Sequence, residues 1–372
     1  MKYVFSLSLI VSLLGCKNKF GIDAKSDMKS KEQVEYVLEG KSIAEIQEYS
    51  VAQLGSAVPN INIDESTIDF CLGDSQTCLY LADVEAISKE TAQKLAQWQG
   101  GMLYLGALTL DKDTIKELVQ WEGEFLHLNG LTTLDASIAT EIAQWRGRVI
   151  DLSLNGLTAL EVDAAKELAQ WKGRLLLLDG LTNLDLEVAK ELSQWSGYSL
   201  HLNGLTSLDG DVAMELGGWD GRLLSLIGLS NIDVATAKGL AQFKGEYLRL
   251  NGVTTLDTEV ARELAKWQGD DPVLALSGLT GLDNDVLQEL AQFKGAFYLC
   301  GLTNLSKDIA QGMATFKADY LYLDGVTTLD IEVARELAKW QGTHISLNGL
   351  TELDGEVAKV LASFKGDISV PK

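Results

Sequence analysis

The sequence is poor in the residues that most often carry out chemistry. It contains 3 histidines, 4 cysteines and 3 prolines among 372 residues. After its first segment it also lacks long apolar runs, and none approaches the roughly 20 residues that a membrane-spanning helix needs. Basic residues are the minority, with 31 Lys and Arg against 53 Asp and Glu, so the net charge is −22. Because such a surface repels phosphate backbones, nucleic acid is a poor partner.

The chain begins with the pattern of a secretory signal. Lys2 precedes an apolar run from Tyr3 to Leu14, which is too short to span a membrane, and Gly15 and Cys16 follow. The segment from Leu13 to Cys16 resembles the lipobox of bacterial lipoproteins. That resemblance implies that residues 1–15 are a cleaved signal peptide and that Cys16 carries lipid, with acyl chains such as palmitate. An ordinary cleaved signal with a cysteine by chance is the alternative.

Residues 16–31 read as a tether between this lipid and the rest of the protein. Five lysines lie between Lys17 and Lys31 in a polar stretch without periodicity, which indicates a flexible spacer that favours an anionic membrane surface. By resemblance to enterobacterial lipoproteins, Lys17 after the acylated cysteine favours the outer membrane over the inner one. We therefore expect a lipid-anchored protein of the bacterial cell envelope, periplasmic or surface-exposed.

A tandem repeat organises most of the chain. Tryptophan or phenylalanine recurs every 23 to 26 residues, and self-similarity at such a period predicts a solenoid. The anchors are Trp98, Trp121, Trp145, Trp171, Trp195, Trp219, Phe243, Trp267, Phe293, Phe316, Trp340 and Phe364. Twelve units over residues 79–366 predict one elongated domain rather than two globular ones.

One repeat shows the local structure expected of the others. Leu248 and Leu250 alternate with Tyr247 and Arg249, which is typical of a short strand with one buried face. A turn at Asn251-Gly252 is expected to use the tolerance of glycine and asparagine for positive φ.

The second half of the same repeat predicts a helix from Thr258 to Trp267. Asp257 is placed to cap its start, and Gly269 is expected to end it in the left-handed conformation. Two repeats are longer by two residues, around Ile150-Asp151 and Asp271-Pro272. An even insertion leaves the inward and outward faces of a strand unchanged.

The pattern Leu-x-Leu, turn, Leu and helix resembles the leucine-rich repeat superfamily. The resemblance implies an α/β solenoid with parallel strands on one face and helices on the other. This sequence departs from the family at the usual asparagine position, where leucine stands in Leu131, Leu157, Leu205 and Leu350. Asparagine instead follows the strand directly, as Asn129, Asn155, Asn203, Asn251 and Asn348. This departure puts the usual asparagine ladder in doubt and suggests a different ladder in the turn.

The two ends need separate interpretations. Residues 32–78 are expected to form an N-terminal cap, helical at first and then irregular or in short strands. Within it, Cys71 and Cys78 either form a disulfide in an oxidising compartment or are two buried thiols. Cys300 replaces the turn asparagine and is interpreted as structural. Residues 367–372 form a short C-terminal segment, in which Pro371 discourages further strand pairing.

The sequence offers no motif for catalysis or metal binding. It has no Gly-rich phosphate loop, nucleophile motif or clustered His, Asp and Ser. His127 and His201 stand three repeats apart, about 14 Å at the spacing of neighbouring strands, and His344 stands further away. Zinc ligands lie about 2 Å from the metal, so these histidines cannot share one ion. We therefore expect no enzyme activity, no metal and no cofactor.

The outward strand positions are the most informative. With Tyr80, six of the ten tyrosines lie there, and tyrosine is favoured at interfaces, although it is also a good strand former. Tyr298 and Tyr322 are expected to stack about 5 Å apart. The predicted binding residues are Tyr104, Phe125, His127, His201, Tyr247, Arg249, Tyr298, Tyr320, Tyr322 and His344. The sequence favours a protein that binds a protein, peptide or glycan on its sheet. The alternative is a passive spacer or adhesion stalk.

Overall fold

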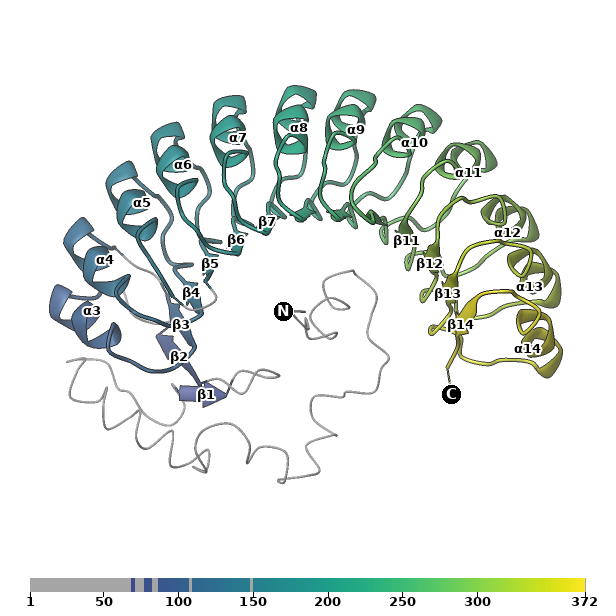
Figure 1. Ribbon diagram of the computed structural model, residues 1–372, viewed down its shortest axis with the longest axis horizontal. Helices are drawn as coiled ribbons and strands as arrows, with labels where there is room; N and C mark the ends of the chain where they lie inside the picture. The colour runs from purple at the N-terminus through teal and green to yellow at the C-terminus, as the bar shows by residue number, and fades with distance from the viewer. Residues whose placement is uncertain (1–67, 71–76, 82–85, 107–108, 148–149, 372) are drawn as a thin grey trace. The chain divides into compact units, whose positions relative to one another are not determined.

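The structure is a computed structural model that describes residues 68–70, 77–81, 86–106, 109–147 and 150–371. The chain divides into two compact units, one of residues 22–201 and one of residues 202–372 with residues 1–21. In each unit, strands lie along one side and helices along the other (Figure 1).

In the unit of residues 22–201, short strands alternate with helices of two turns. The strands are β1 (Ile68–Phe70), β2 (Thr77–Leu81), β3 (Met102–Leu105), β4 (Phe125–His127), β5 (Asp151–Ser153), β6 (Leu175–Leu177) and β7 (Ser199–His201). The helices are α3 (Lys89–Leu95), α4 (Lys112–Leu118), α5 (Ala136–Ile142), α6 (Val162–Leu168) and α7 (Leu186–Leu192). β1 pairs antiparallel with β2, and the later strands pair in parallel in chain order.

The unit that contains residues 202–372 repeats the same plan. Its strands are β8 (Leu223–Ser225), β9 (Tyr247–Arg249), β10 (Val273–Ala275), β11 (Ala296–Tyr298), β12 (Tyr320–Tyr322), β13 (His344–Ser346) and β14 (Asp367–Ser369). Its helices are α8 (Gly210–Gly217), α9 (Val234–Leu240), α10 (Thr258–Leu264), α11 (Asn284–Leu290), α12 (Lys307–Met313), α13 (Ile331–Leu337) and α14 (Gly355–Leu361). Its strands are parallel in chain order. The predicted α/β solenoid of leucine-rich-repeat type is confirmed.

An aromatic ladder fills the space between sheet and helices. In the unit of residues 22–201, Trp98, Trp121, Trp145 and their successors stack with ring centroids 5.8 to 6.1 Å apart. The indole N–H of Trp121 donates to the carbonyl oxygen of Trp98 at 3.0 Å, and that of Trp145 to Trp121 at 2.9 Å. These buried polar groups are thereby satisfied by the neighbouring repeat.

The two longer repeats keep the pattern of faces, as predicted. Leu152 on β5 is paired with Leu126, and Leu274 on β10 is paired with Leu248. All four leucines are fully buried. The extra residues therefore lie before the strands, not within them.

The reason for the repeated glycines differs from the expectation. Neither Gly252 nor Gly269 has a positive φ. A Cβ atom on Gly252 would lie 2.0 Å from the carbonyl oxygen of Ile227, and one on Gly269 would lie 2.1 Å from that of Gly245. Glycine is required because the backbones of successive repeats come too close for a side chain.

The helices are shorter than predicted. α10 ends at Leu264, and the N–H groups of Lys266 and Trp267 then make bonds three residues back instead of four, which tightens the last turn. Asp257 is the N-cap residue but its side chain makes no capping hydrogen bond. Other repeats do use this bond, as in Asp135, whose carboxylate accepts from the N–H groups of Ser137 and Ile138.

The residues that follow the strands form a ladder in the turn. The side-chain oxygen of Asn129 accepts bonds from the Ser153 hydroxyl at 2.6 Å and from the Asn155 N–H at 3.0 Å. In the other unit, Asp324 accepts from the Ser346 hydroxyl at 2.5 Å and from the Asn348 N–H at 2.9 Å. Each side chain thus links its turn to the next repeat.

The C-terminal segment corrects another expectation. β14 pairs with β13, with Asp367 opposite His344. Pro371 follows the strand and its missing N–H is not needed for that pairing. The sheet therefore extends one strand beyond the predicted twelve units.

Candidate functional site

The outward positions of β9 to β13 form two columns across the sheet. One column runs Tyr247, Val273, Ala296, Tyr320 and His344. The other runs Arg249, Ala275, Tyr298, Tyr322 and Ser346. In the first column, Val273 on β10 and Ala296 on β11 thus stand between Tyr247 and Tyr320. Because these two side chains are small, they leave room on the sheet between the tyrosines.

The predicted contact of two tyrosines is present. The rings of Tyr298 and Tyr322 stack with centroids 4.0 Å apart and planes 9° from parallel. Burial, followed by the neighbouring Tyr322, raises the pKa of the Tyr298 phenol, so its hydroxyl stays protonated and can donate a hydrogen bond. Tyr320 is 42% exposed. Together, exposed Tyr320 and the half-buried pair offer aromatic surface with polar edges, which suits recognition.

A cavity of about 930 Å³ lies beside these tyrosines. Tyr247, Tyr298, Tyr320 and Tyr322 all line it. Its volume is within the range of ligand pockets, roughly 300–1,000 Å³. We call this cavity and its lining the tyrosine cleft.

The cleft lies at the second of the two longer repeats. Its two extra residues, around Asp271-Pro272, are called the second insertion, and the backbone is distorted there. Asp271 and Gly295 both line it, and among the described residues they alone have positive φ, 48° and 146°. The N–H of Ala296 donates to the carbonyl oxygen of Pro272 at 2.8 Å. A Cβ atom on Gly295 would lie 2.1 Å from that same oxygen. The insertion therefore requires glycine here, so position 295 contributes no side chain to the cleft.

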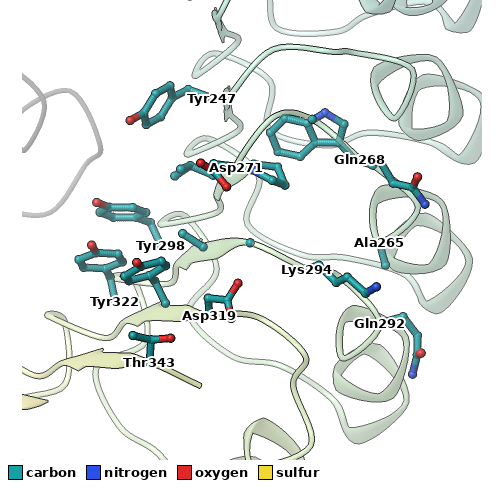
Figure 2. Close-up of a pocket in the computed structure, with 17 residues that line it drawn as sticks. Tyr247, Ala265, Gln268, Asp271, Gln292, Lys294, Tyr298, Asp319, Tyr322 and Thr343 are labelled. Carbon is teal, nitrogen blue, oxygen red and sulfur yellow. The ribbon is translucent and has the colours of Figure 1, made fainter. Parts of the chain in front are cut away.

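The polar lining is arranged along the cleft. Figure 2 shows the tyrosines at one end, Lys294 and Gln292 at the other, and Asp271 and Asp319 between them. Asp271, Asp319 and Lys294 are exposed. In the part of the chain that the structure describes, none of the three takes part in an ion pair.

A second aromatic group lies on the sheet of the other unit. The ring of His127 stacks on Tyr104 at 3.7 Å and on Phe125 at 4.0 Å between centroids. Both ring nitrogens of His127 are buried without a hydrogen-bond partner in the structure. Burial lowers the pKa of His127 to about 3, so this histidine is neutral at physiological pH. We call these three residues the histidine cluster.

Asp151 lies next to the histidine cluster, opposite Phe125 in the sheet. Its carboxylate accepts two bonds from Arg174, from Nε at 3.0 Å and from a terminal nitrogen at 2.5 Å. Burial raises the pKa of the Asp151 carboxyl, and the guanidinium opposes that change. At the first of the two longer repeats, around Ile150-Asp151, which we call the first insertion, the carboxylate is thus paired with an arginine of the chain itself.

Two predicted binding residues are buried instead of exposed on the sheet. His201 and Arg249 are only 5% and 3% exposed. His201 bonds to the hydroxyl of Ser199 at 3.0 Å. Outward strand positions lie so close together in a parallel sheet that neighbouring side chains cover one another, so position alone does not give exposure.

The sequence interpretation missed Asp271, Asp319 and Lys294. All three lie one or two residues before a strand. The alternation of side chains within a strand gives no information about residues at that place. The 26-residue spacing around Asp271-Pro272 was the available signal, because an insertion before a strand changes the edge of the sheet. His344, a predicted binding residue, lies next to the tyrosine pair, and its ring centroid is 6.0 Å from that of Tyr322.

The cysteine predictions fall largely outside the described residues. Cys16 and Cys71 lie there, and the Cys78 side chain is not described. The disulfide stays a prediction, testable by mass spectrometry of a non-reduced digest. The sulfur of Cys300 lies 3.9 Å from the carbonyl oxygen of Tyr322.

Two further findings concern the described residues. They contain no group of three or more His, Cys, Asp or Glu side chains placed to hold a metal ion. No helix among them is long and apolar enough to cross a membrane.

Comparison with known proteins gives structural similarities only. No family model and no curated protein matches the sequence. An internalin from Listeria monocytogenes is 16% identical, with a TM-score of 0.44, over 88% of this chain and 90% of that one. A TLR13–ssRNA13 complex is 17% identical, with a TM-score of 0.38, over 75% of this chain and 37% of that one. The Toll–Spätzle complex from Drosophila is 12% identical, with a TM-score of 0.39, over 73% and 36%.

Proposed function

We propose that this chain is a lipid-anchored, non-catalytic binding protein of the bacterial cell envelope. Its ligand is a protein, peptide or glycan that binds on the sheet around Tyr298, Tyr320 and Tyr322. The observation that carries this proposal is the stacked tyrosine pair, 4.0 Å between centroids, at the wall of a cavity of about 930 Å³.

The chemistry of the tyrosine cleft supports binding. Tyrosines supply large contact surfaces with few rotamers to immobilise, and such residues often contribute most of the binding energy of an interface. The cleft also has carboxylates, amides and an ammonium group that can orient a ligand. It has no evident nucleophile paired with a base, which catalysis by covalent attack would need.

Capture of a partner tests the binding surface. Wild type and Tyr320→Ser/Tyr322→Ser are used to isolate cross-linked partners from solubilised envelopes, and the affinity of an identified partner is then measured. The double variant should bind at least about tenfold more weakly, or 1.4 kcal/mol. Circular dichroism should show an unchanged fold, because outward strand residues contribute modestly to the core.

Lys238→Ser/Gln242→Ser is the matched control. Lys238 and Gln242 are exposed, in α9 and just after it, and their replacement should leave capture unchanged. A folded tyrosine variant with full affinity would reject the binding surface and favour the passive spacer or adhesion stalk.

The anchor is a separate part of the proposal, supported by the resemblance of the first residues to a lipobox. Cys16→Ser should move the protein from the membrane fraction to the soluble fraction, because the proposed lipid is attached through the thiol of Cys16. Density-gradient separation of the two membranes then tests the expectation from Lys17 that wild type is in the outer membrane. A variant that stays wholly membrane-bound would show that the lipid is not the anchor.

A further inference from the structure

The two longer repeats show what can occupy the space that an insertion opens. At the first, the Arg174 guanidinium makes two hydrogen bonds to Asp151, and Asp151 in turn lies opposite Phe125 of the histidine cluster. Arg174 is the residue directly before β6. Its planar cation therefore lies next to the N-terminal end of β6, paired with the carboxylate of Asp151.

The second insertion has a glycine at the equivalent place. Gly295 directly precedes β11, which pairs with the strand of the inserted repeat just as β6 does. Gly295 cannot be arginine, because its φ is 146° and a Cβ atom would lie 2.1 Å from the Pro272 carbonyl oxygen. The carboxylates and aromatic rings are present here, but the chain does not provide the cation from this position.

The groups around Gly295 suit a cation. The backbone N–H of Asp319 donates to the carbonyl oxygen of Gly295 at 2.7 Å, so Asp319 is in the next repeat. Asp271 stands in the preceding repeat, beside Pro272. Two carboxylates thus flank the position, and the tyrosines supply aromatic surface for cation–π contact. With Lys294 at the far end, the lining has one net negative charge, from two aspartates and one lysine.

We propose that the tyrosine cleft binds an arginine side chain of a basic peptide segment in the partner protein. The guanidinium lies over Gly295 between Asp271 and Asp319 and stacks on the tyrosines. This inference rests on the proposed binding function and specifies its ligand. Arginine is favoured over lysine because a planar guanidinium can both stack and make paired bonds to carboxylates. The net charge of −22 also favours a basic partner over a neutral glycan.

The test uses two blocked peptides and the purified full chain. One peptide has the sequence Gly-Arg-Gly-Arg-Gly, and the other has citrulline in place of arginine, which keeps the shape and removes the charge. By isothermal titration calorimetry the arginine peptide should bind about tenfold more tightly or better than the citrulline peptide. Equal affinities would overturn the proposal.

Variants then locate the site. Asp271→Asn/Asp319→Asn should weaken binding of the arginine peptide by about tenfold and should not change binding of the citrulline peptide. Asp285→Asn/Asp308→Asn is the matched control, since both residues are exposed in the first turns of α11 and α12 and the net charge changes equally. A similar loss in both double variants would mean that general attraction, not the cleft, holds the peptide, and would overturn the proposal.

The same variants separate this inference from the proposed function. If partner capture falls in Tyr320→Ser/Tyr322→Ser but is unaffected by Asp271→Asn/Asp319→Asn and by excess arginine peptide, the binding surface stands and the arginine site is wrong. If capture survives the tyrosine variant, the binding surface itself is wrong.

Discussion

The two longer repeats differ in which residues lie beside their extra residues. Both carry extra residues before a strand, and both keep the buried leucines in place. At the first, Arg174 and Asp151 close the edge of the sheet. At the second, Gly295 leaves it open beside exposed Asp271 and Asp319. An insertion before one strand therefore creates a potential binding site. The residue directly before the next strand, Arg174 or Gly295, determines whether a side chain of the chain itself occupies that site.

The largest expected effect is at the open insertion. Gly295→Ala forces a side chain into a φ of 146° and against the Pro272 carbonyl oxygen. Strain and overpacking should together lower the free energy of unfolding by about 3 kcal/mol, measured by urea denaturation. Gly281→Ala is the control, because a Cβ there meets nothing within 4 Å. Equal stability of the two variants would mean that the open edge does not depend on Gly295.

At the closed insertion, the ion pair is the feature to break. Arg174→Ala leaves the buried Asp151 carboxylate without its cation and should lower the free energy of unfolding by about 2–3 kcal/mol at neutral pH. Lys294→Ala at the open insertion should change it by less than about 0.5 kcal/mol. If both variants are equally stable, Arg174 does not close the edge.

The cost of Arg174→Ala should also depend on pH. The pKa of Asp151 is raised in the folded state, so the folded state binds more protons and the contribution of this group to stability falls as pH rises through that pKa. Removing the guanidinium should strengthen this dependence. The variant should therefore approach wild-type stability below about pH 4, where the carboxyl is protonated.

The histidine cluster should make its side of the comparison sensitive to acid. The pKa of His127 is about 3 in the folded state, below its ordinary value of 6.5. The unfolded state therefore binds more protons between these values, and stability present above pH 6.5 is lost as pH falls toward 3. His127→Phe should remove a loss of about 3 kcal/mol between about pH 7 and pH 4. Identical pH profiles in wild type and variant would show that His127 is not sealed.

The two aromatic groups should differ in what they contribute. Tyr104→Ser/Phe125→Ser should lower the free energy of unfolding by about 1 kcal/mol through lost ring contacts and should leave partner affinity within about twofold. Tyr320→Ser/Tyr322→Ser should do the reverse. Unfolding curves and partner titrations on both variants test the contrast, and equal losses of affinity would place the ligand on both groups.

The smallest effect concerns helix capping. Asp135→Ala removes two hydrogen bonds to the start of α5 and should lower the free energy of unfolding by about 1 kcal/mol. Asp257→Ala removes no such bond and should lower it by less than half as much. Equal losses would mean that the aspartates act through their charge near the helix start rather than through the bond.

The sequence by itself determined the repeat, its faces and its order. Alternation around Leu248 and Leu250 identifies the strand, and the recurring tryptophans identify the unit, because buried positions must be apolar wherever the same fold is repeated. The stacking of Tyr298 on Tyr322 also followed, since parallel pairing places equivalent residues of successive repeats side by side.

Only the tertiary structure decided what each position does. Gly252 is glycine because of a carbonyl group in the preceding repeat, and Gly295 because of an insertion that bends the backbone beside it. Arg249 and Tyr320 both point outward on their strands, yet one is 3% and the other 42% exposed. The tyrosine cleft joins residues from Tyr247 to Thr343. Exposure, close approach and cavity shape depend on atoms about 24 residues away along the chain, and strand alternation within one repeat does not contain them.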